Sequence, residues 1–114
     1  MNQTNQPVDG ATLVAHLQQI RRRLSLPKRL DTVEVELIVM REDKIIELNN
    51  QFHHSNQPTD VLSFPSRSEM TLGSICLNPA LAASYVVQSN TSLTEELKML
   101  SGHGLLHLLG FNHR

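Results

Sequence analysis

Three histidines near the end of the chain have the spacing of a metal site. Residues 103–113 place His103, His107 and His113 in the pattern H-x3-H-x2-G-x2-H. On a helix, residues four apart lie on one face about one turn from each other, so the first two imidazoles can converge. Gly110 can end that helix in a left-handed conformation and return His113 to the same point. Three neutral imidazoles leave the fourth position of a tetrahedral zinc open to water, as in catalytic zinc sites.

This pattern is unusual for a chain of this composition. Six His and five Gly in 114 residues would produce it somewhere in the chain with a probability of roughly 7 × 10⁻⁴. The alternative is that His103 and His107 pack a helix and that His113 is a terminal residue without a role. A leucine-rich helix gains nothing from imidazoles that need hydrogen-bond partners, so the metal interpretation is favoured.

The same spacing occurs in the long zinc-protease helix motif, with one difference. In that motif Glu follows the first His and serves as general base, whereas this chain has Gly104 there. No acidic residue lies between Glu96 and the end of the sequence, which disfavours a zinc peptidase. Gly102 and Gly104 predict that this helix packs closely against another backbone, because glycine inside a helix otherwise costs about 1 kcal/mol.

The composition is that of one ordinary globular domain covering residues 1–114. Hydrophobic residues make up 39% of the chain and charged residues 18%. No apolar run reaches the length of a membrane span, and the first nine residues show no secretory signal and are expected to be flexible. The single cysteine, Cys76, excludes an internal disulfide and is expected in the core. We therefore expect a cytoplasmic protein that does not enter a membrane.

The distribution of charge points to a second candidate site. Net charge is −1, yet five of the ten basic residues lie within nine positions: Arg21, Arg22, Arg23, Lys28 and Arg29. Arg21, Arg22, Lys28 and Arg29 are candidates for contacts with the phosphates of a substrate. A solvated helix end is an equally good interpretation. The chain has three Phe and one Tyr, which disfavours a base-stacking platform.

Hydrophobic periodicity and capping signals give the order of the elements. The sequence predicts helix 10–25, strand 33–40, helix 42–53, strand 61–64, strand 72–77, a helix from 79 to about 89 and a helix from 92 to about 109. Asn78 with Pro79, and Ser92 with Glu95, are start signals for the last two helices. The expected fold class is α+β: a small mixed sheet packed with about four helices, with the three-histidine zinc site at the end of the last one.

Three segments together resemble the YbeY family. They are the tail HGLLHLLGFNHR, residues 59–65 (TDVLSFP) and residues 47–49 (ELN). The resemblance covers roughly residues 33–113. It implies a single-domain zinc-dependent endoribonuclease that cuts single-stranded RNA in rRNA maturation (the 16S rRNA 3′ end) and ribosome quality control. It also implies one Zn²⁺ per chain on the three histidines, rRNA and the small ribosomal subunit or its factors as partners, and a cytoplasmic location.

The chain departs from the family at several positions. His53 stands where members usually carry Arg, so a protonated imidazole would have to take over a guanidinium's contact with phosphate. A polar residue at a helix end is the alternative interpretation of His53. Ser74 and Asn112 stand where members usually carry aspartates. They are candidates to hydrogen-bond and orient the imidazoles that bind the metal, but they lack the charge of a carboxylate. No opening strand is readable in residues 1–9, and the chain stops shortly after His113.

These departures leave two functional hypotheses. The first is a metal-dependent endoribonuclease with His53 in a catalytic position and no assigned general base. The second is a catalytically weakened ribosome-associated factor that binds RNA or protein and retains its zinc site.

Overall fold

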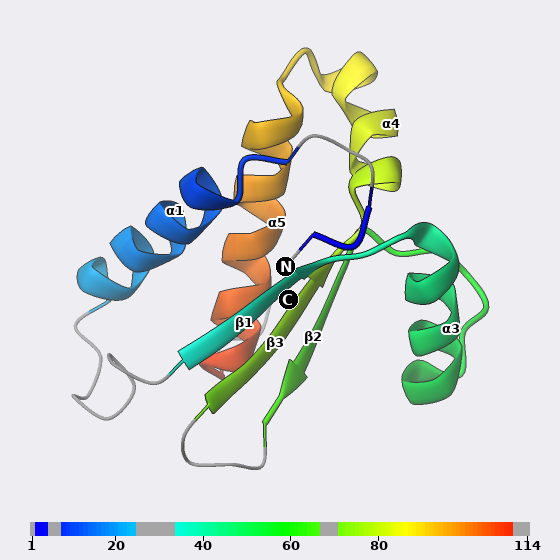
Figure 1. Ribbon diagram of the computed structural model, residues 1–114, viewed down its shortest axis with the longest axis horizontal. Helices are drawn as coiled ribbons and strands as arrows, with labels where there is room; N and C mark the ends of the chain where they lie inside the picture. The colour runs from blue at the N-terminus through cyan, green and yellow to red at the C-terminus, as the bar shows by residue number, and fades with distance from the viewer. Residues whose placement is uncertain (1, 5–7, 25–33, 67–70, 111–114) are drawn as a thin grey trace.

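The computed structural model describes residues 2–4, 8–24, 34–66 and 71–110 (Figure 1). Its elements follow the predicted order of helix, strand, helix, strand, strand, helix, helix. They are α1 (Gly10–Arg23), β1 (Glu34–Val39), α3 (Glu42–His53), β2 (Val61–Pro65), β3 (Thr71–Leu77), α4 (Pro79–Ser89) and α5 (Leu93–Leu108). The α+β prediction is confirmed. No helix within these described ranges is long and apolar enough to cross a membrane.

The sheet is mixed and its strands are ordered β1-β3-β2. β1 runs parallel to the central strand β3, and β2 runs antiparallel to it. Gly73 marks the tightest point of β3: it has a φ of 150°, and a Cβ there would meet the carbonyl oxygen of Phe64 and stand 2.8 Å from Cδ2 of Leu108. The strand pair and the end of α5 can therefore approach each other this closely because residue 73 has no side chain.

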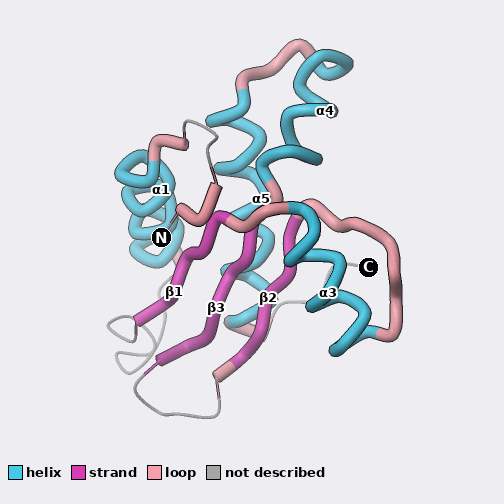
Figure 2. Tube along the Cα trace, turned by 45° about the vertical axis from the view of Figure 1, so that its right-hand side comes forward, coloured by secondary structure: helices cyan, strands magenta, loops and turns pink. Residues whose placement is uncertain are grey.

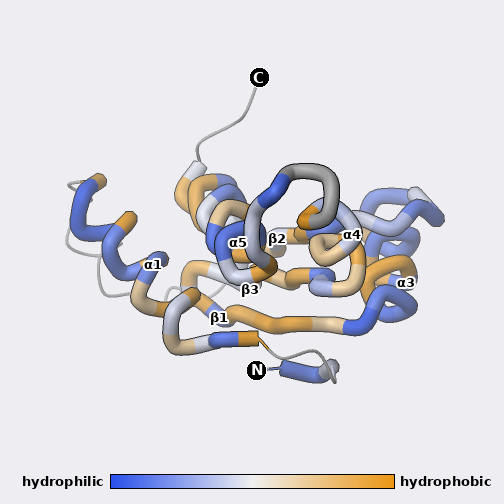
Figure 3. The backbone as a smooth tube through the Cα atoms, turned by 90° about the horizontal axis from the view of Figure 1, so that it is seen from above, coloured by the Kyte–Doolittle hydropathy of each residue, from blue (hydrophilic) through white to orange (hydrophobic). Residues whose placement is uncertain are grey.

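Helices cover both faces of the sheet, and each face has its own core (Figure 3). On one face α1, α4 and α5 pack on β3 around Leu13, Leu17, Ile75, Leu77, Ala82, Leu97 and Leu105. On the other face α3 packs through Ile45 on Leu62 and Cys76. Cys76 is buried in this second core, as predicted. Its burial raises the pKa of the thiol to about 11.

Side-chain caps begin the last two helices as the sequence predicts. The Asn78 side chain accepts a hydrogen bond from the Leu81 N–H at 3.2 Å, with Pro79 in the first turn. The Ser92 hydroxyl accepts one from the Glu95 N–H at 3.1 Å. Each cap satisfies a backbone donor that has no partner inside the helix, which fixes where the helix starts.

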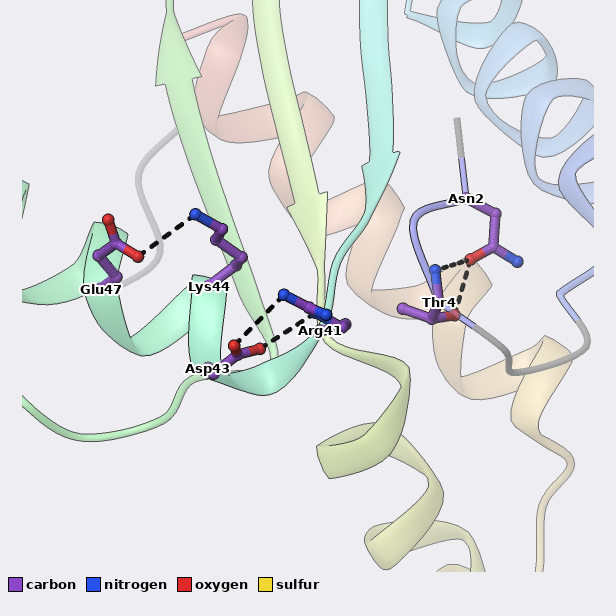
Figure 4. A network of polar contacts seen from close by, with 6 residues as sticks. All are labelled: Asn2, Thr4, Arg41, Asp43, Lys44 and Glu47. Atoms are coloured by element: carbon purple, nitrogen blue, oxygen red, sulfur yellow. Dashed lines mark hydrogen bonds and ion pairs between the residues drawn. The ribbon is translucent and has the colours of Figure 1, made fainter.

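The first residues pair with β1, although the sequence shows no opening strand there. Asn2 forms a parallel bridge with Val39, and the Gln3 N–H donates to the Val39 carbonyl at 2.8 Å. One bridge thus extends the edge of β1. Figure 4 shows this segment near the start of α3, where exposed ion pairs join Arg41 to Asp43 and Lys44 to Glu47.

Candidate functional site

Helix α5 carries the first two histidines of the predicted metal site, His103 and His107. The helix ends as the sequence predicts: the Gly110 N–H donates to the His107 carbonyl at 3.1 Å, and Gly110 has a φ of 95°. A residue with positive φ cannot continue a right-handed helix, so the chain changes direction here.

Two glycines fix how α5 is rotated about its axis. A Cβ on Gly104 would stand 2.7 Å from Cγ2 of Ile75 in β3, and one on Gly102 would stand 3.2 Å from Cδ1 of Ile20 in α1. The close packing is as predicted, but both glycines meet side chains rather than a neighbouring backbone. Successive helical residues are about 100° apart, so His103 points away from both α1 and Ile75.

His107 lies one turn after His103 on the same side of α5. His103 is half-buried and His107 is exposed, so both are accessible from solvent. Neutral imidazoles are good ligands for zinc, and two on adjacent turns of one face fit two corners of a tetrahedral site.

The third expected ligand, His113, and its neighbour Asn112 lie outside the described residues. Within the part of the chain that the structure describes, no group of three or more His, Cys, Asp or Glu side chains is arranged to hold a metal ion.

His53 is the last residue of α3. Nδ1 of His53 lies 3.2 Å from Oδ1 of Asn49, whose Nδ2 donates to the Gln57 carbonyl at 2.9 Å. Because the amide nitrogen of Asn49 is held in this way, Asn49 presents its oxygen to His53, and the contact is a hydrogen bond when Nδ1 carries the proton. The imidazole also lies nearly parallel to the ring of Phe64, with a centroid distance of 6.3 Å.

The ends of three elements meet at one end of the molecule. In Figures 1 and 2, α3, β2 and α5 run in the same general direction, and their C-terminal ends lie at the end of the sheet opposite α4. A Cβ on Gly73 would meet Leu108 on one side and the backbone of Phe64 and Pro65 on the other, so the end of α5 lies beside the last residues of β2. His53 and the pair His103 and His107 therefore lie on opposite faces of β2, an edge strand within the described sheet.

The basic residues lie elsewhere. Arg21 and Arg22 belong to the last turn of α1 and border a groove of about 980 Å³ between α1 and the sheet. Helix α1 packs on the Gly102 side of α5, whereas His103 points to the other side. Lys28 and Arg29 lie outside the described residues. The structure therefore does not bring Arg21 and Arg22 to the histidine pair.

Ser74 is also separated from that pair. Gly73 and Ile75 face α5, so the alternation of a strand turns Ser74 to the opposite face. There its hydroxyl donates to Oε1 of Glu36 at 2.9 Å. The described part of the site thus gains no support from Ser74.

Asn49 is a candidate functional residue that the sequence patterns did not identify. Its side chain is 8% exposed and connects His53 to the loop that follows α3. The sequence did contain a signal for this role. Asn49 lies within the apolar stripe of Ile45, Leu48 and Phe52, and a buried amide at such a position must find hydrogen-bond partners.

Comparison with known proteins decides the family. The family model described as "Endoribonuclease YbeY" matches residues 1–114. This chain belongs to the YbeY family. The endoribonuclease YbeY of Aliarcobacter butzleri is 41% identical over 93 residues, which are 78% of this chain and 66% of that protein. The endoribonuclease YbeY of Thermotoga maritima is 35% identical over 104 residues, 91% of this chain and 69% of that one.

A solved structure shows the same fold. The solution structure of a protein from Thermotoga maritima superposes with a TM-score of 0.59 at 32% identity and covers 100% of this chain and 75% of the other. This YbeY-family chain thus spans about half to three quarters of the length of the relatives it matches. The resemblance inferred from the tail and from residues 47–49 and 59–65 is confirmed at the level of the family.

Proposed function

We propose that this chain is a zinc-dependent endoribonuclease that cleaves single-stranded RNA in rRNA maturation and ribosome quality control. Membership in the YbeY family supports an RNA-cleaving hydrolase with a role in rRNA processing. The observation that carries the zinc proposal is the pair His103 and His107, one turn apart on the accessible side of α5.

The proposed metal site uses His103, His107 and His113. Zinc, when bound, lowers the pKa of a bound water toward neutrality and polarises a phosphoryl oxygen. The rotation of α5, set by Gly102 and Gly104, points the first two imidazoles away from α1 and toward solvent. A substrate therefore reaches them from the β2 side of the molecule.

His53 is proposed to contact the RNA phosphate from the other face of β2. When protonated, its imidazole offers a charged N–H to a phosphate oxygen, a stronger donor than a neutral group. Asn49 contacts Nδ1, so Nε2 is the ring nitrogen that is left for the phosphate. An imidazole presents one such donor where a guanidinium presents a two-pronged fork, so we expect weak cleavage.

A second candidate function is an RNA- or protein-binding factor of the small ribosomal subunit that retains zinc but has lost most catalysis. Two observations favour it: His53 replaces the family's usual arginine, and Ser74 faces away from α5. Under either function we propose a cytoplasmic protein with rRNA and the small ribosomal subunit as partners.

Metal analysis paired with RNA cleavage tests the proposal. The untagged protein is analysed for zinc and incubated with a single-stranded RNA, with His107→Ala prepared in parallel to reveal contaminating nuclease. About one zinc per chain with cleavage that His107→Ala abolishes supports the enzyme. Zinc without cleavage supports the binding factor, and absence of both contradicts the two candidates.

A further inference from the structure

An aromatic side chain at the end of α3 is patterned for burial but exposed. Ile45, Leu48 and Phe52 form one stripe of the helix, and Ile45 is completely buried against Leu62 and Cys76. Phe52 continues this stripe by one more turn, yet it is 54% exposed. Packing of the core therefore explains why residue 45 is apolar, but it does not explain why residue 52 is.

Phe52 belongs to a small aromatic cluster on β2. Its ring meets the ring of Phe64 edge-on, with centroids 5.1 Å apart and an interplanar angle of 61°. On the same Phe64 the imidazole of His53 lies nearly parallel, at 7°. We refer to Phe52, His53 and Phe64 as the aromatic cluster. Phe64 and the Asn49 contact hold its two outer rings in place before any ligand arrives.

We propose that the aromatic cluster is a stacking site for an unpaired nucleobase, with the base lying on the exposed face of Phe52. Aromatic faces stack on any base, and this mode dominates recognition of single-stranded RNA. The site rests on the proposed function, because it supplies a position for a nucleotide next to the one whose phosphate meets His53.

The surroundings of the cluster favour a base over a protein partner. The exposed residues of the segment that contains Phe52 include, beside His53 and His54, four uncharged amides: Asn50, Gln51, Asn56 and Gln57. Such amides can pair with base edges. No acidic residue lies between Glu47 and Asp60, so this segment holds no carboxylate that repels a phosphate backbone.

Position also favours RNA. The cluster lies at the ends of α3 and β2, the same end of the molecule where α5 carries His107 (Figure 1). A strand that crosses the edge of β2 would have one nucleotide on Phe52 and the next phosphates near His53 and the histidine pair. One exposed phenyl ring with a polar rim also falls far short of the area of a stable protein interface, which buries about 800 Å² on each partner.

The test uses the full chain and an uncleavable 2′-O-methyl hexanucleotide that carries one 2-aminopurine, a base whose fluorescence falls when it stacks. Phe52→Leu keeps the apolar volume and removes the π face, and Phe52→Tyr keeps the face. Tyr85→Leu is the matched control, because Tyr85 is 42% exposed and lies on α4, away from the cluster. Thermal unfolding confirms that all variants are folded.

We expect the unmodified protein to quench the fluorophore and Phe52→Leu to raise Kd roughly 5- to 150-fold, since stacking on one aromatic is worth about 1–3 kcal/mol per base. Phe52→Tyr and Tyr85→Leu should bind like the unmodified protein. Equal Kd and quenching in Phe52→Leu, or no binding of the hexanucleotide at all, would overturn the proposal.

The binding assay separates this proposal from the proposed function because it requires no cleavage. Phe52-dependent quenching by a protein that cleaves no RNA would sustain the stacking site and contradict the endoribonuclease. RNA cleavage by a protein whose hexanucleotide binding does not depend on Phe52 would support the endoribonuclease and contradict the stacking site.

Discussion

Gly104 of α5 lies directly against Ile75 of β3, and a Cβ at position 104 would stand 2.7 Å from Cγ2 and 3.2 Å from Cγ1 of that side chain. Ile75 is completely buried, so it has no space to move into. The absence of a side chain at residue 104 thus sets the distance between α5 and the sheet. Because His103 precedes Gly104, the same contact determines where the first imidazole points.

We predict that Gly104→Ala destabilises the protein by about 1–3 kcal/mol, since overpacking a filled core forces backbone shifts. Gly10→Ala is the control: no atom lies within 4 Å of a Cβ there, so it should be neutral or slightly stabilising. Thermal or urea unfolding of both variants measures the difference. Equal stability of the two would show that α5 is not held down on Ile75.

The contact between α1 and α5 should weaken in acid. Burial, followed by the positive charge of Lys98, lowers the pKa of His16. The opposing effect of Glu95 is smaller, and it is followed by a lowering effect of Arg23 and a raising effect of the backbone hydrogen bond with Lys98. The unfolded chain therefore binds a proton at His16 more readily than the folded chain does. Its contribution to stability is present above the ordinary histidine pKa of about 6.5 and is lost as pH falls below it.

We accordingly expect His16→Gln to lose less Tm than the unmodified protein between pH 7.5 and pH 5. A chelator in both samples removes any contribution from zinc. His54→Asn, a substitution at an exposed histidine with a φ of 55°, serves as control and should follow the unmodified protein. Parallel pH curves for all three proteins would contradict the role of His16.

The sequence predicted the elements well because their signals are local. Apolar periodicity marked the helices and strands, and Asn78, Ser92 and Gly110 act within one turn of the ends they define. The relations across the sheet were not local. The contact between the rings of His53 and Phe64 and the packing of Gly104 against Ile75 each join residues from different elements. Apolar periodicity within one helix or strand does not predict such contacts.

Two further features of the site depend on contacts between elements. The side of α5 on which His103 lies depends on where α1 packs, so the sequence left open whether Arg21 and Arg22 share its face. The exposure of Phe52 depends on how far the sheet extends beneath α3, and the apolar pattern alone indicated burial.

Loss of one imidazole should remove the metal. We predict that His107→Ala no longer retains stoichiometric zinc, because two histidines do not hold a catalytic zinc site tightly. His54→Asn removes a histidine from the end of α3 and should keep zinc. Elemental analysis of untagged proteins after dialysis measures both. Stoichiometric zinc in His107→Ala would contradict the three-histidine assignment.

The basic residues at the end of α1 should contribute to RNA binding. Arg22 borders the groove between α1 and the sheet, whose lining also includes Phe64 and Pro65 at the end of β2. Replacing Arg22, Lys28 and Arg29 with Gln should weaken RNA binding and flatten its salt dependence. Zinc content should be unchanged. If the salt dependence of RNA binding were unchanged in this variant, the basic residues would not contact phosphates and would only form a solvated helix end.

His53→Arg should increase RNA cleavage. Arginine restores a permanent charge with a two-pronged donor, and its planar group can stack on Phe64 as the imidazole does. Rates on one single-stranded RNA are compared from pH 6 to pH 8.5 at fixed salt and equal zinc content. His53→Gln, which offers no charge, should not increase the rate, and the gain from arginine should vanish when combined with His107→Ala. If the rate of His53→Arg equals that of the unmodified protein across this range, residue 53 does not act on the substrate phosphate, and the family's arginine role does not extend to this position.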